Sequence, residues 1–276
     1  MRSFEFPGKT CFLTGAASGI GEALALDLAA RGCALALVDR DEPGLKRVAD
    51  AARQRGATDV TTYLVDLSDG GDRLDLAEQV LAHHRRVDLV INNAGVALGG
   101  ALHQVTLADF DWLISVNFGA VVRVTKAFLP HLRENPGAHL VNLSSLFGLI
   151  APPGQVAYAA SKYAVRGFTE ALRHELAPVG VGVTVVHPGG IRTNIAVNAR
   201  ISTGQVSEEE IKQGRDRMNA SLTMPPAQAA RQILDAVARR RPRLVITRLA
   251  KVADVIARLT PGHYWTIMAK LSARRR

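Results

Sequence analysis

Short apolar runs alternate with longer helical patterns along most of this chain. The first run, residues 9–14, passes into a glycine-rich turn, then into a helical pattern at 22–30 and a second apolar run at 33–38. This order of strand, turn, helix and strand is that of a βαβ unit. The alternation continues, with strand-like runs at 60–65, 87–91, 139–143, 183–186 and 244–247 and long helical patterns at 106–132 and 157–177.

Most of the strand-like runs are continuously apolar, which is typical of a parallel sheet covered by helices on both faces. We therefore predict an α/β fold with a doubly wound, Rossmann-type parallel sheet of about seven strands. No internal repeat or interdomain linker interrupts the pattern. The prediction is a single domain over residues 1–247, with a lid at 194–222, and a basic amphipathic C-terminal extension at 248–276.

The turn after the first strand has residues suited to binding a phosphate, namely Gly15, Ser18, Gly19, Ile20 and Gly21. Glycines let the backbone approach a phosphate closely. The free N–H groups and the dipole of the helix that follows attract it. The glycine spacing is looser than the dinucleotide fingerprint, so the turn does not identify a cofactor by itself.

Residues at the ends of the second and third strands bear on which cofactor binds. Asp39 can accept hydrogen bonds from an adenosine ribose and would repel a 2′-phosphate, whereas Arg40 would attract that phosphate. We predict NAD, with NADP as the alternative. Asp66, with Leu67 beside it, can accept a hydrogen bond from the adenine amino group, although a lone Asp at a strand end is also a common turn residue.

Further polar motifs follow the next two strands. Asn93, Ala94 and Gly95 come directly after the fourth strand, and Ser144 and Ser145 come after the fifth. The carboxyl ends of parallel strands are where α/β sheets bind ligands. The alternative for the Asn-Gly motif is a tight turn. Because the glycine turn, Asp39, Asp66 and these two motifs all follow strands, we expect them to form one site.

Tyr158 and Lys162 stand four residues apart in a predicted helix, shortly after Ser145. Side chains at i and i+4 lie on one face of a helix. A free tyrosine has a pKa near ~10, and a neighbouring cation lowers it by favouring the phenolate. Taken alone, this pair is an ordinary helical spacing; with the motifs before and after it, it predicts a general acid/base.

The chain resembles the short-chain dehydrogenase/reductase family over about residues 8–247. The resemblance rests on motifs that appear in the family order: Thr14-Gly-x-x-x-Gly-x-Gly21, Asp66, Asn92-Asn-Ala-Gly95, Asn117, Ser144-Ser145, Tyr158-x-x-x-Lys162 and Pro188-Gly189 with Thr193. Each motif is common by itself. Together, in order and at the family spacing, they are specific.

The resemblance implies a role for each catalytic residue. Tyr158 exchanges a proton with the substrate oxygen, Ser145 holds that oxygen, and Lys162 lowers the pKa of Tyr158 and binds the nicotinamide ribose. Asn117 completes a proton relay with Lys162, although an Asn within a helix can also merely distort it. The resemblance also places Pro188, Gly189, Ile191 and Thr193 at the cofactor, with Thr193 and the backbone near Ile191 holding the carboxamide.

Charge is unevenly distributed along the chain. The net charge is +9, yet residues 239–276 contain eleven Lys or Arg and one acid, which leaves the remainder at −1. The excess therefore belongs to the tail, and a nucleic-acid-binding face on the core is not supported. Residues 1–10 contain no signal-peptide core, and no apolar run is long enough to span a bilayer. We expect a cytoplasmic protein.

Cysteine and histidine usage indicates no further chemistry. Cys11 and Cys33 lie in apolar runs and are expected to be free thiols. His83 and His84 are expected to be solvated and His187 to be structural. No ligand spacing predicts a metal site, and no Gly-x-Ser-x-Gly elbow predicts a hydrolase.

Two segments bear on the substrate and on partners. Residues 146–153 are almost devoid of polar groups, so a hydrophobic substrate is expected if they wall the pocket; core packing is the alternative. In the lid, residues 207–210 predict a capping box.

The tail contains an amphipathic pattern. Leu249, Val252, Val255, Ile256 and Leu259 share one helical face, followed by a Pro-Gly break and the aromatic segment 263–271. Peripheral membrane contact and packing on the protein both remain open for this tail.

These observations predict an NAD(P)-dependent oxidoreductase that interconverts a secondary alcohol and a ketone or aldehyde on a hydrophobic small molecule. The alternatives are a noncatalytic dinucleotide-binding redox sensor and a protein whose tail docks on a membrane or partner. By the resemblance, a homodimer or homotetramer forms through the two long helices.

Overall fold

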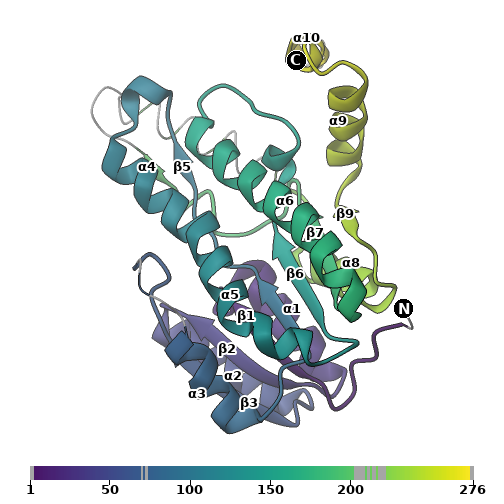
Figure 1. Cartoon of the computed structure of the whole chain (residues 1–276). Coiled ribbons are helices and arrows are strands. Elements are labelled where there is room, and N and C mark those ends of the chain that lie inside the picture. Colours follow the sequence, from purple (N-terminus) through teal and green to yellow (C-terminus); the bar gives the residue numbers. More distant parts are fainter. Residues whose placement is uncertain are drawn as a thin grey trace.

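A computed structural model describes residues 3–69, 71, 74–201, 209, 212, 216 and 222–273. Its centre is a seven-stranded sheet in the order β3-β2-β1-β4-β6-β7-β9, in which every pairing is parallel (Figure 1). The strands are β1 Thr10–Thr14, β2 Ala34–Asp39, β3 Asp59–Leu64, β4 Leu89–Asn92, β6 His139–Leu143, β7 Gly182–His187 and β9 Arg243–Val245. This confirms the predicted α/β class, and each of the seven predicted strands is present within one or two residues at either end.

Alternate residues of each strand point into two separate cores. Cys11 and Leu13 of β1 pack with helices on one face, and Phe12 packs with helices on the other. The first face is covered by α1 Gly19–Ala30, α2 Glu42–Gln54 and α8 Pro226–Ala238; the second is covered by α3 Leu74–His84, α5 Ala120–Arg133 and α6 Val156–Leu176. Burial on both faces explains why these strands are continuously apolar.

The helix predicted at 106–132 has a local defect in the structure. It consists of α4 Leu107–Ile114, a π-helical segment Ser115–Gly119 and α5. By length and composition alone, Leu107–Arg133 could cross a membrane, and half of its most apolar window is buried inside the protein. The buried residues of α5, among them Val124 and Phe128, contact the sheet, which accounts for the apolar composition.

Two short strands were not predicted. β5 Leu98–Gly99 and β8 Arg200–Ile201 form a separate parallel pair. Their pairing links residues about a hundred positions apart, and two-residue strands carry no periodicity that a sequence pattern could reveal. β8 lies within the predicted lid. The capping box expected at 207–210 falls outside the described residues, apart from Glu209.

The C-terminal segment forms two helices, α9 Arg248–Leu259 and α10 Tyr264–Ala273, at the end of the molecule beyond β9 (Figure 1). α9 packs through Ala250 and Ala253 and through Asp254, whose carboxylate is 2.7 and 2.9 Å from the guanidinium nitrogens of Arg243. Its more apolar face is instead exposed: Leu249, Val252, Val255 and Leu259 are 54–77% accessible. The domain division at residue 247 stays a prediction.

Candidate active site

A cavity of about 930 Å³ opens at the carboxyl ends of the central strands. It brings together all but two of the residues predicted to be catalytic or cofactor-binding. The predicted residues that line it are Gly15, Ser18, Gly19, Ile20, Asp39, Arg40, Asp66, Leu67, Asn93, Ala94, Gly95, Ser145, Tyr158, Lys162, Pro188, Gly189, Ile191 and Thr193. Gly21 and Asn117 are not among the lining residues.

The glycine turn is shaped by close backbone contacts. Gly15 has a φ of +66°, and a Cβ added there would lie 2.8 Å from the Ala94 Cα. The Asn93 amide clamps the turn by donating to the Thr14 and Gly15 carbonyls, each at 3.0 Å. Gly21 is buried, and its Cβ would lie 1.8 Å from the Gly15 carbonyl oxygen. Gly21 thus lets α1 start against the turn, and its predicted contact with the cofactor stays a prediction.

Asp39 is oriented by the backbone at the end of β2. Its carboxylate accepts hydrogen bonds from the N–H groups of Ala17 at 2.9 Å, Arg40 at 2.7 Å and Asp41 at 3.1 Å. The Arg40 guanidinium lies 4.0 Å from the Asp66 carboxylate, and both side chains are more than half exposed. The backbone thus orients the Asp39 carboxylate at the cavity, whereas the Arg40 side chain is exposed to solvent.

Ser145, rather than Ser144, faces the cavity. The Ser144 hydroxyl is buried and donates to the Lys162 carbonyl at 2.8 Å. Ser145 lies two residues beyond the end of β6 and caps the short 3-10 helix Leu146–Gly148, where its hydroxyl accepts from the Phe147 N–H at 3.1 Å. The preference for Ser145 over Ser144, based on the interval to Tyr158, agrees with this geometry.

Tyr158 and Lys162 lie on the first turns of α6 and are almost fully buried, with 8% and 4% exposure. The Lys162 Nζ donates to the Leu143 carbonyl at 3.2 Å and lies 5.8 Å from the Tyr158 ring centroid. The Tyr158 ring packs edge-on against Phe147. Phenol, ammonium and the Ser145 hydroxyl therefore meet at the inner end of the cavity, as the i, i+4 spacing predicts.

Asn117 lies in the π-helical segment and is completely buried. Its Oδ1 accepts a hydrogen bond from the Val96 N–H at 2.8 Å. Its Nδ2 donates to the Val96 carbonyl at 3.0 Å and to the Ser161 hydroxyl at 3.1 Å. A Cβ added at Gly95 would be 3.3 Å from both the Asn117 Oδ1 and the Lys162 Nζ. Asn117 is thus close to Lys162 but is engaged in holding the chain after β4. The proton relay stays a prediction.

Comparison with known proteins decides the family. The family model for short chain dehydrogenases matches residues 9–203. The chain belongs to the short-chain dehydrogenase/reductase family. A putative oxidoreductase, SadH, of Mycobacterium tuberculosis is 44% identical over 271 residues, which are 98% of this chain and 96% of that protein.

Solved structures agree with this assignment. A short-chain dehydrogenase/reductase from Burkholderia phymatum in complex with NAD has a TM-score of 0.84 at 33% identity and covers 92% of this chain and 94% of its own. A metagenomic short-chain oxidoreductase in complex with NADP has a TM-score of 0.71 at 28% identity, and the match covers 88% of this chain and 98% of that protein. This short-chain dehydrogenase is accordingly an oxidoreductase.

One electrostatic expectation is wrong for the protein alone. Burial raises the pKa of Tyr158, and a hydrogen bond with Ser145 opposes this only in part. Burial also lowers the pKa of Lys162 to about 8. Lys162 by itself therefore does not lower the pKa of Tyr158 as expected, because desolvation favours the neutral form of both groups. In the protein without cofactor, burial therefore favours the protonated phenol of Tyr158.

His187 is buried, as its expected structural role requires, and it supports the site. The Nδ1 donates to the Ser145 carbonyl at 3.1 Å, and burial lowers the pKa of the imidazole to about 3. A neutral imidazole thus holds the backbone of Ser145. The sequence offered only the proximity of His187 to the Pro-Gly motif, which does not reveal this contact.

The outer cavity wall includes residues that the sequence did not assign to the site. Leu249, Trp265 and Met268 come from the C-terminal helices, and Asn194 and Leu222 come from the two ends of the predicted lid. The Tyr264 hydroxyl also accepts from the Ala151 N–H at 3.0 Å, which links α10 to the loop before α6.

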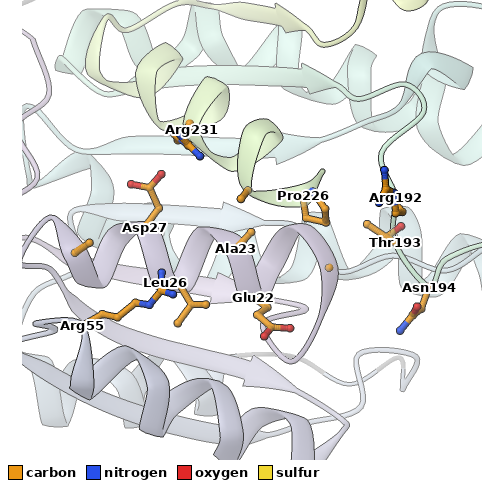
Figure 2. Close-up of a pocket in the computed structure, with 13 residues that line it drawn as sticks. Glu22, Ala23, Leu26, Asp27, Arg55, Arg192, Thr193, Asn194, Pro226 and Arg231 are labelled. Atoms are coloured by element: carbon orange, nitrogen blue, oxygen red, sulfur yellow. The ribbon is translucent and has the colours of Figure 1, made fainter. Parts of the chain in front are cut away.

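A second hollow of about 650 Å³ lies on the outer side of α1, between this helix, α8 and residues 192–194 (Figure 2). It shares Gly19, Thr193 and Asn194 with the main cavity. None of the four predicted catalytic residues lines it. The predicted catalytic residues are thus associated with the main cavity only, apart from Asn117, which lines neither hollow.

Proposed function

We propose that this chain interconverts a secondary alcohol and a ketone or aldehyde on a hydrophobic substrate, with Tyr158 as the general acid/base. The observation that carries the proposal is the meeting of Tyr158, Ser145 and Lys162 at the inner end of a cavity with largely apolar outer walls. The raised pKa of Tyr158 keeps the phenol in the form that donates a proton to a ketone oxygen.

The residues present fit a nicotinamide dinucleotide. The glycine turn leaves no room for a Cβ at Gly15, and α1 begins at the turn with Ser18, whose side chain does not cap the helix. These features leave backbone N–H groups for a pyrophosphate. NAD and NADP are bound by the Burkholderia phymatum and metagenomic relatives, respectively. When bound, the nicotinamide accepts or supplies the hydride.

The fixed carboxylate of Asp39 supports NAD over NADP, because it would repel a 2′-phosphate. Lys162 would bind the ribose of the nicotinamide half, and Thr193, at the cavity wall near Gly19, would hold its carboxamide. In this arrangement Ser145 orients the substrate oxygen toward the Tyr158 hydroxyl.

The walls support an apolar substrate. Leu146, Phe147, Ile150 and Pro152 line the cavity, so the apolar loop at 146–153 contributes to the pocket and is not only core. Leu249, Trp265 and Met268 continue this apolar surface outward. Burial of a hydrocarbon body against such walls contributes roughly 25 cal/mol per Å².

Absorbance of the reduced nicotinamide tests this function. We expect turnover with apolar secondary alcohols or ketones, a kcat/KM that falls for polar analogues of equal size, and a higher kcat/KM with NAD than with NADP. A preference for the polar analogues would contradict the hydrophobic substrate, and a preference for NADP would contradict the role of Asp39. A noncatalytic redox sensor would instead show a rise in melting temperature with NAD and no turnover.

We also infer that the tail brings this cytoplasmic enzyme to an anionic membrane surface. Leu249, Val252, Val255 and Leu259 form one exposed apolar stripe on α9, which we call the α9 stripe. The stripe adjoins the cavity, because Leu249 belongs to both. Eleven basic residues and one acid lie between positions 239 and 276. Pairing with a second copy would oppose like charges, whereas anionic lipid complements them. Assembly as a homodimer or homotetramer through α4–α5 and α6 stays a prediction.

Co-sedimentation with lipid vesicles tests the membrane proposal. We expect binding to phosphatidylserine vesicles but not to phosphatidylcholine vesicles, and binding about tenfold weaker or worse in a Val252→Glu/Val255→Glu variant. Leu107→Glu changes a leucine outside the stripe that is even more exposed, at 82% against 54% for Val252 and Val255, and is the control. Unchanged lipid binding in the double variant, or a change in its oligomeric state instead, would contradict the proposal.

A further inference from the structure

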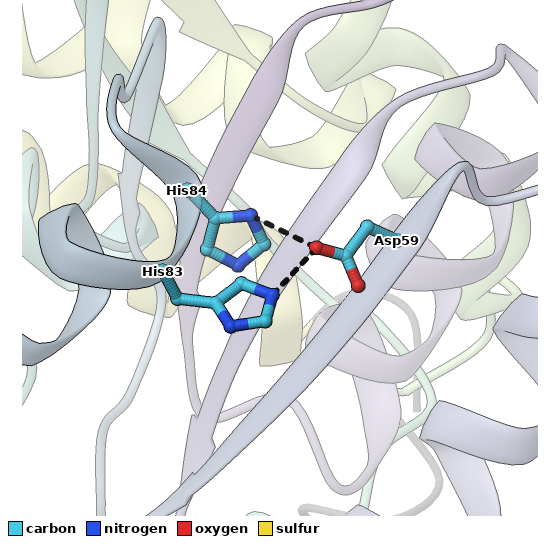
Figure 3. A group of neighbouring side chains, drawn as sticks. All are labelled: Asp59, His83 and His84. Carbon is cyan, nitrogen blue, oxygen red and sulfur yellow. Dashed lines mark hydrogen bonds and ion pairs between the residues drawn. The ribbon is translucent and has the colours of Figure 1, made fainter.

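Two adjacent histidines and one aspartate form a cluster of neighbouring side chains (Figure 3). The cluster lies at the amino end of β3, whereas the main cavity opens at the carboxyl ends of the strands. Asp59 is the first residue of β3, the edge strand, and His83 and His84 are the last two residues of α3. One ligand atom from each residue lies within 4.8 Å of the other two. The Asp59 Oδ2 is 2.7 Å from the His83 Nε2 and 3.6 Å from the His84 Nδ1.

The expectation that His84 is solvated is wrong. Its side chain is only 2% exposed, and its Nε2 lies 2.7 Å from the Thr61 hydroxyl. That hydroxyl points toward the Leu35 carbonyl at 3.5 Å, so it can donate there and accept from the His84 Nε2–H. In this tautomer the Nδ1 lone pair faces the Asp59 carboxylate. Two acceptors then face each other, which a cation between them would stabilise.

We propose that Asp59, His83 and His84 form a binding site for a divalent transition-metal ion such as Zn²⁺. Two imidazole nitrogens and one carboxylate oxygen are a donor set that this ion accepts, with water completing the coordination. The hydrogen bond between His84 and Thr61 fixes the imidazole from behind, as partners of metal-binding histidines commonly do. Hard cations such as Mg²⁺ prefer oxygen ligands and are not expected to bind.

The surroundings of the cluster favour a cation. The carboxyl end of α3 directs its negative pole at the site. Two of the nearby bases are engaged elsewhere: Arg86 pairs with Asp88, and Arg53 binds Asp50 and the Val60 carbonyl. His83 and Asp59 are about half exposed, which allows them to spread from their present 2.7 Å contact around an ion.

The position of the site defines what the ion does. It would tie the end of α3 to the start of the edge strand β3, far from the carboxyl ends of the strands where Tyr158 lies. The ion is therefore a stabilising element and not a participant in proton transfer. Turnover should not depend on it at temperatures where the protein is fully folded.

Calorimetric titration and thermal unfolding of chelator-treated protein, without a histidine tag, test the proposal. We expect one Zn²⁺ per chain and a melting temperature about 5 °C higher at saturating Zn²⁺, with no shift in Mg²⁺. A Co²⁺ adduct should show visible absorption bands that Zn²⁺ abolishes. Asp59→Asn and His83→Gln should each lose the Zn²⁺ shift, because these partly exposed residues keep their size but lose a ligand.

His131→Gln alters an exposed histidine on α5 and is the matched control, which should retain the full shift. No Zn²⁺-specific shift in the wild-type protein would overturn the proposal. An equal shift in wild type, Asp59→Asn and His83→Gln would also overturn it, because the ion would then bind elsewhere.

Discussion

Replacing Tyr158 by phenylalanine is expected to lower kcat about a thousandfold while the protein stays folded. The variant removes one hydroxyl from the inner end of the cavity and keeps the ring that packs against Phe147. Because the side chain is only 8% exposed and the phenol is neutral, no buried charge is gained or lost. Steady-state kinetics with the best substrate of the apolar panel provide the measurement.

Tyr163→Phe is the matched control, since Tyr163 lies five residues further along α6 and does not line the cavity. Its kcat should stay within about twofold of wild type. NAD should still raise the melting temperature of Tyr158→Phe. If that variant retained a tenth or more of wild-type turnover, Tyr158 would not be the general acid/base.

Lys162→Met is expected to abolish turnover and at the same time to stabilise the protein. Burial lowers the pKa of Lys162 from 10.5 to about 8, which corresponds to a cost of about 3 kcal/mol for keeping the ammonium in the folded protein at pH 7. Methionine fills a similar volume without a charge. It loses the hydrogen bond to the Leu143 carbonyl, worth about 1 kcal/mol, so a net gain of roughly 2 kcal/mol is expected.

The gain in stability of Lys162→Met over wild type should decrease as the pH rises. Between pH 8 and 10.5 the unfolded chain holds a proton at Lys162 that the folded protein has released, so wild-type stability rises with pH there. The advantage of the variant is therefore full below pH 8 and disappears above 10.5. Urea unfolding at several pH values measures it. Lys126→Met, at an exposed position of α5, should change stability by less than about 0.5 kcal/mol.

A destabilised Lys162→Met at pH 7, or a difference that does not vary with pH, would contradict this account. The expected combination of lost activity and increased stability is typical of a side chain that is kept buried for function. It would distinguish Lys162 from a residue that only supports the fold.

The strands and the order of the motifs could be predicted because they depend on local patterns. β6 was predicted at its observed bounds, since a run of apolar residues buried on both faces leaves little choice of structure. The convergence of the glycine turn, Asp39 and Ser145 follows from topology, because parallel strands bring their carboxyl ends to one edge. The i, i+4 rule similarly placed Tyr158 beside Lys162.

No local sequence pattern could predict the contacts between segments that are distant along the chain. The tail helix α9 packs through Ala250, Ala253 and Asp254 and leaves its more apolar face exposed. Shape decides this: a Cβ at Gly189 would be 3.0 Å from the Ala250 Cβ, so only small residues fit against that loop. The bidentate pair of Asp254 with Arg243 then holds the helix in this rotation.

The fold class, the family and most residues of the cavity could thus be predicted from local periodicity and from the order of the motifs along the chain. The protonation and the contacts of those residues could not, because they depend on the folded protein around them. Burial raises the pKa of Tyr158 and lowers that of Lys162. Contacts between distant segments join Asn117 to Val96 and bring Asp59 beside His83 and His84. Desolvation and long-range contact depend on how much protein surrounds a group, and that quantity exists only once the chain has folded.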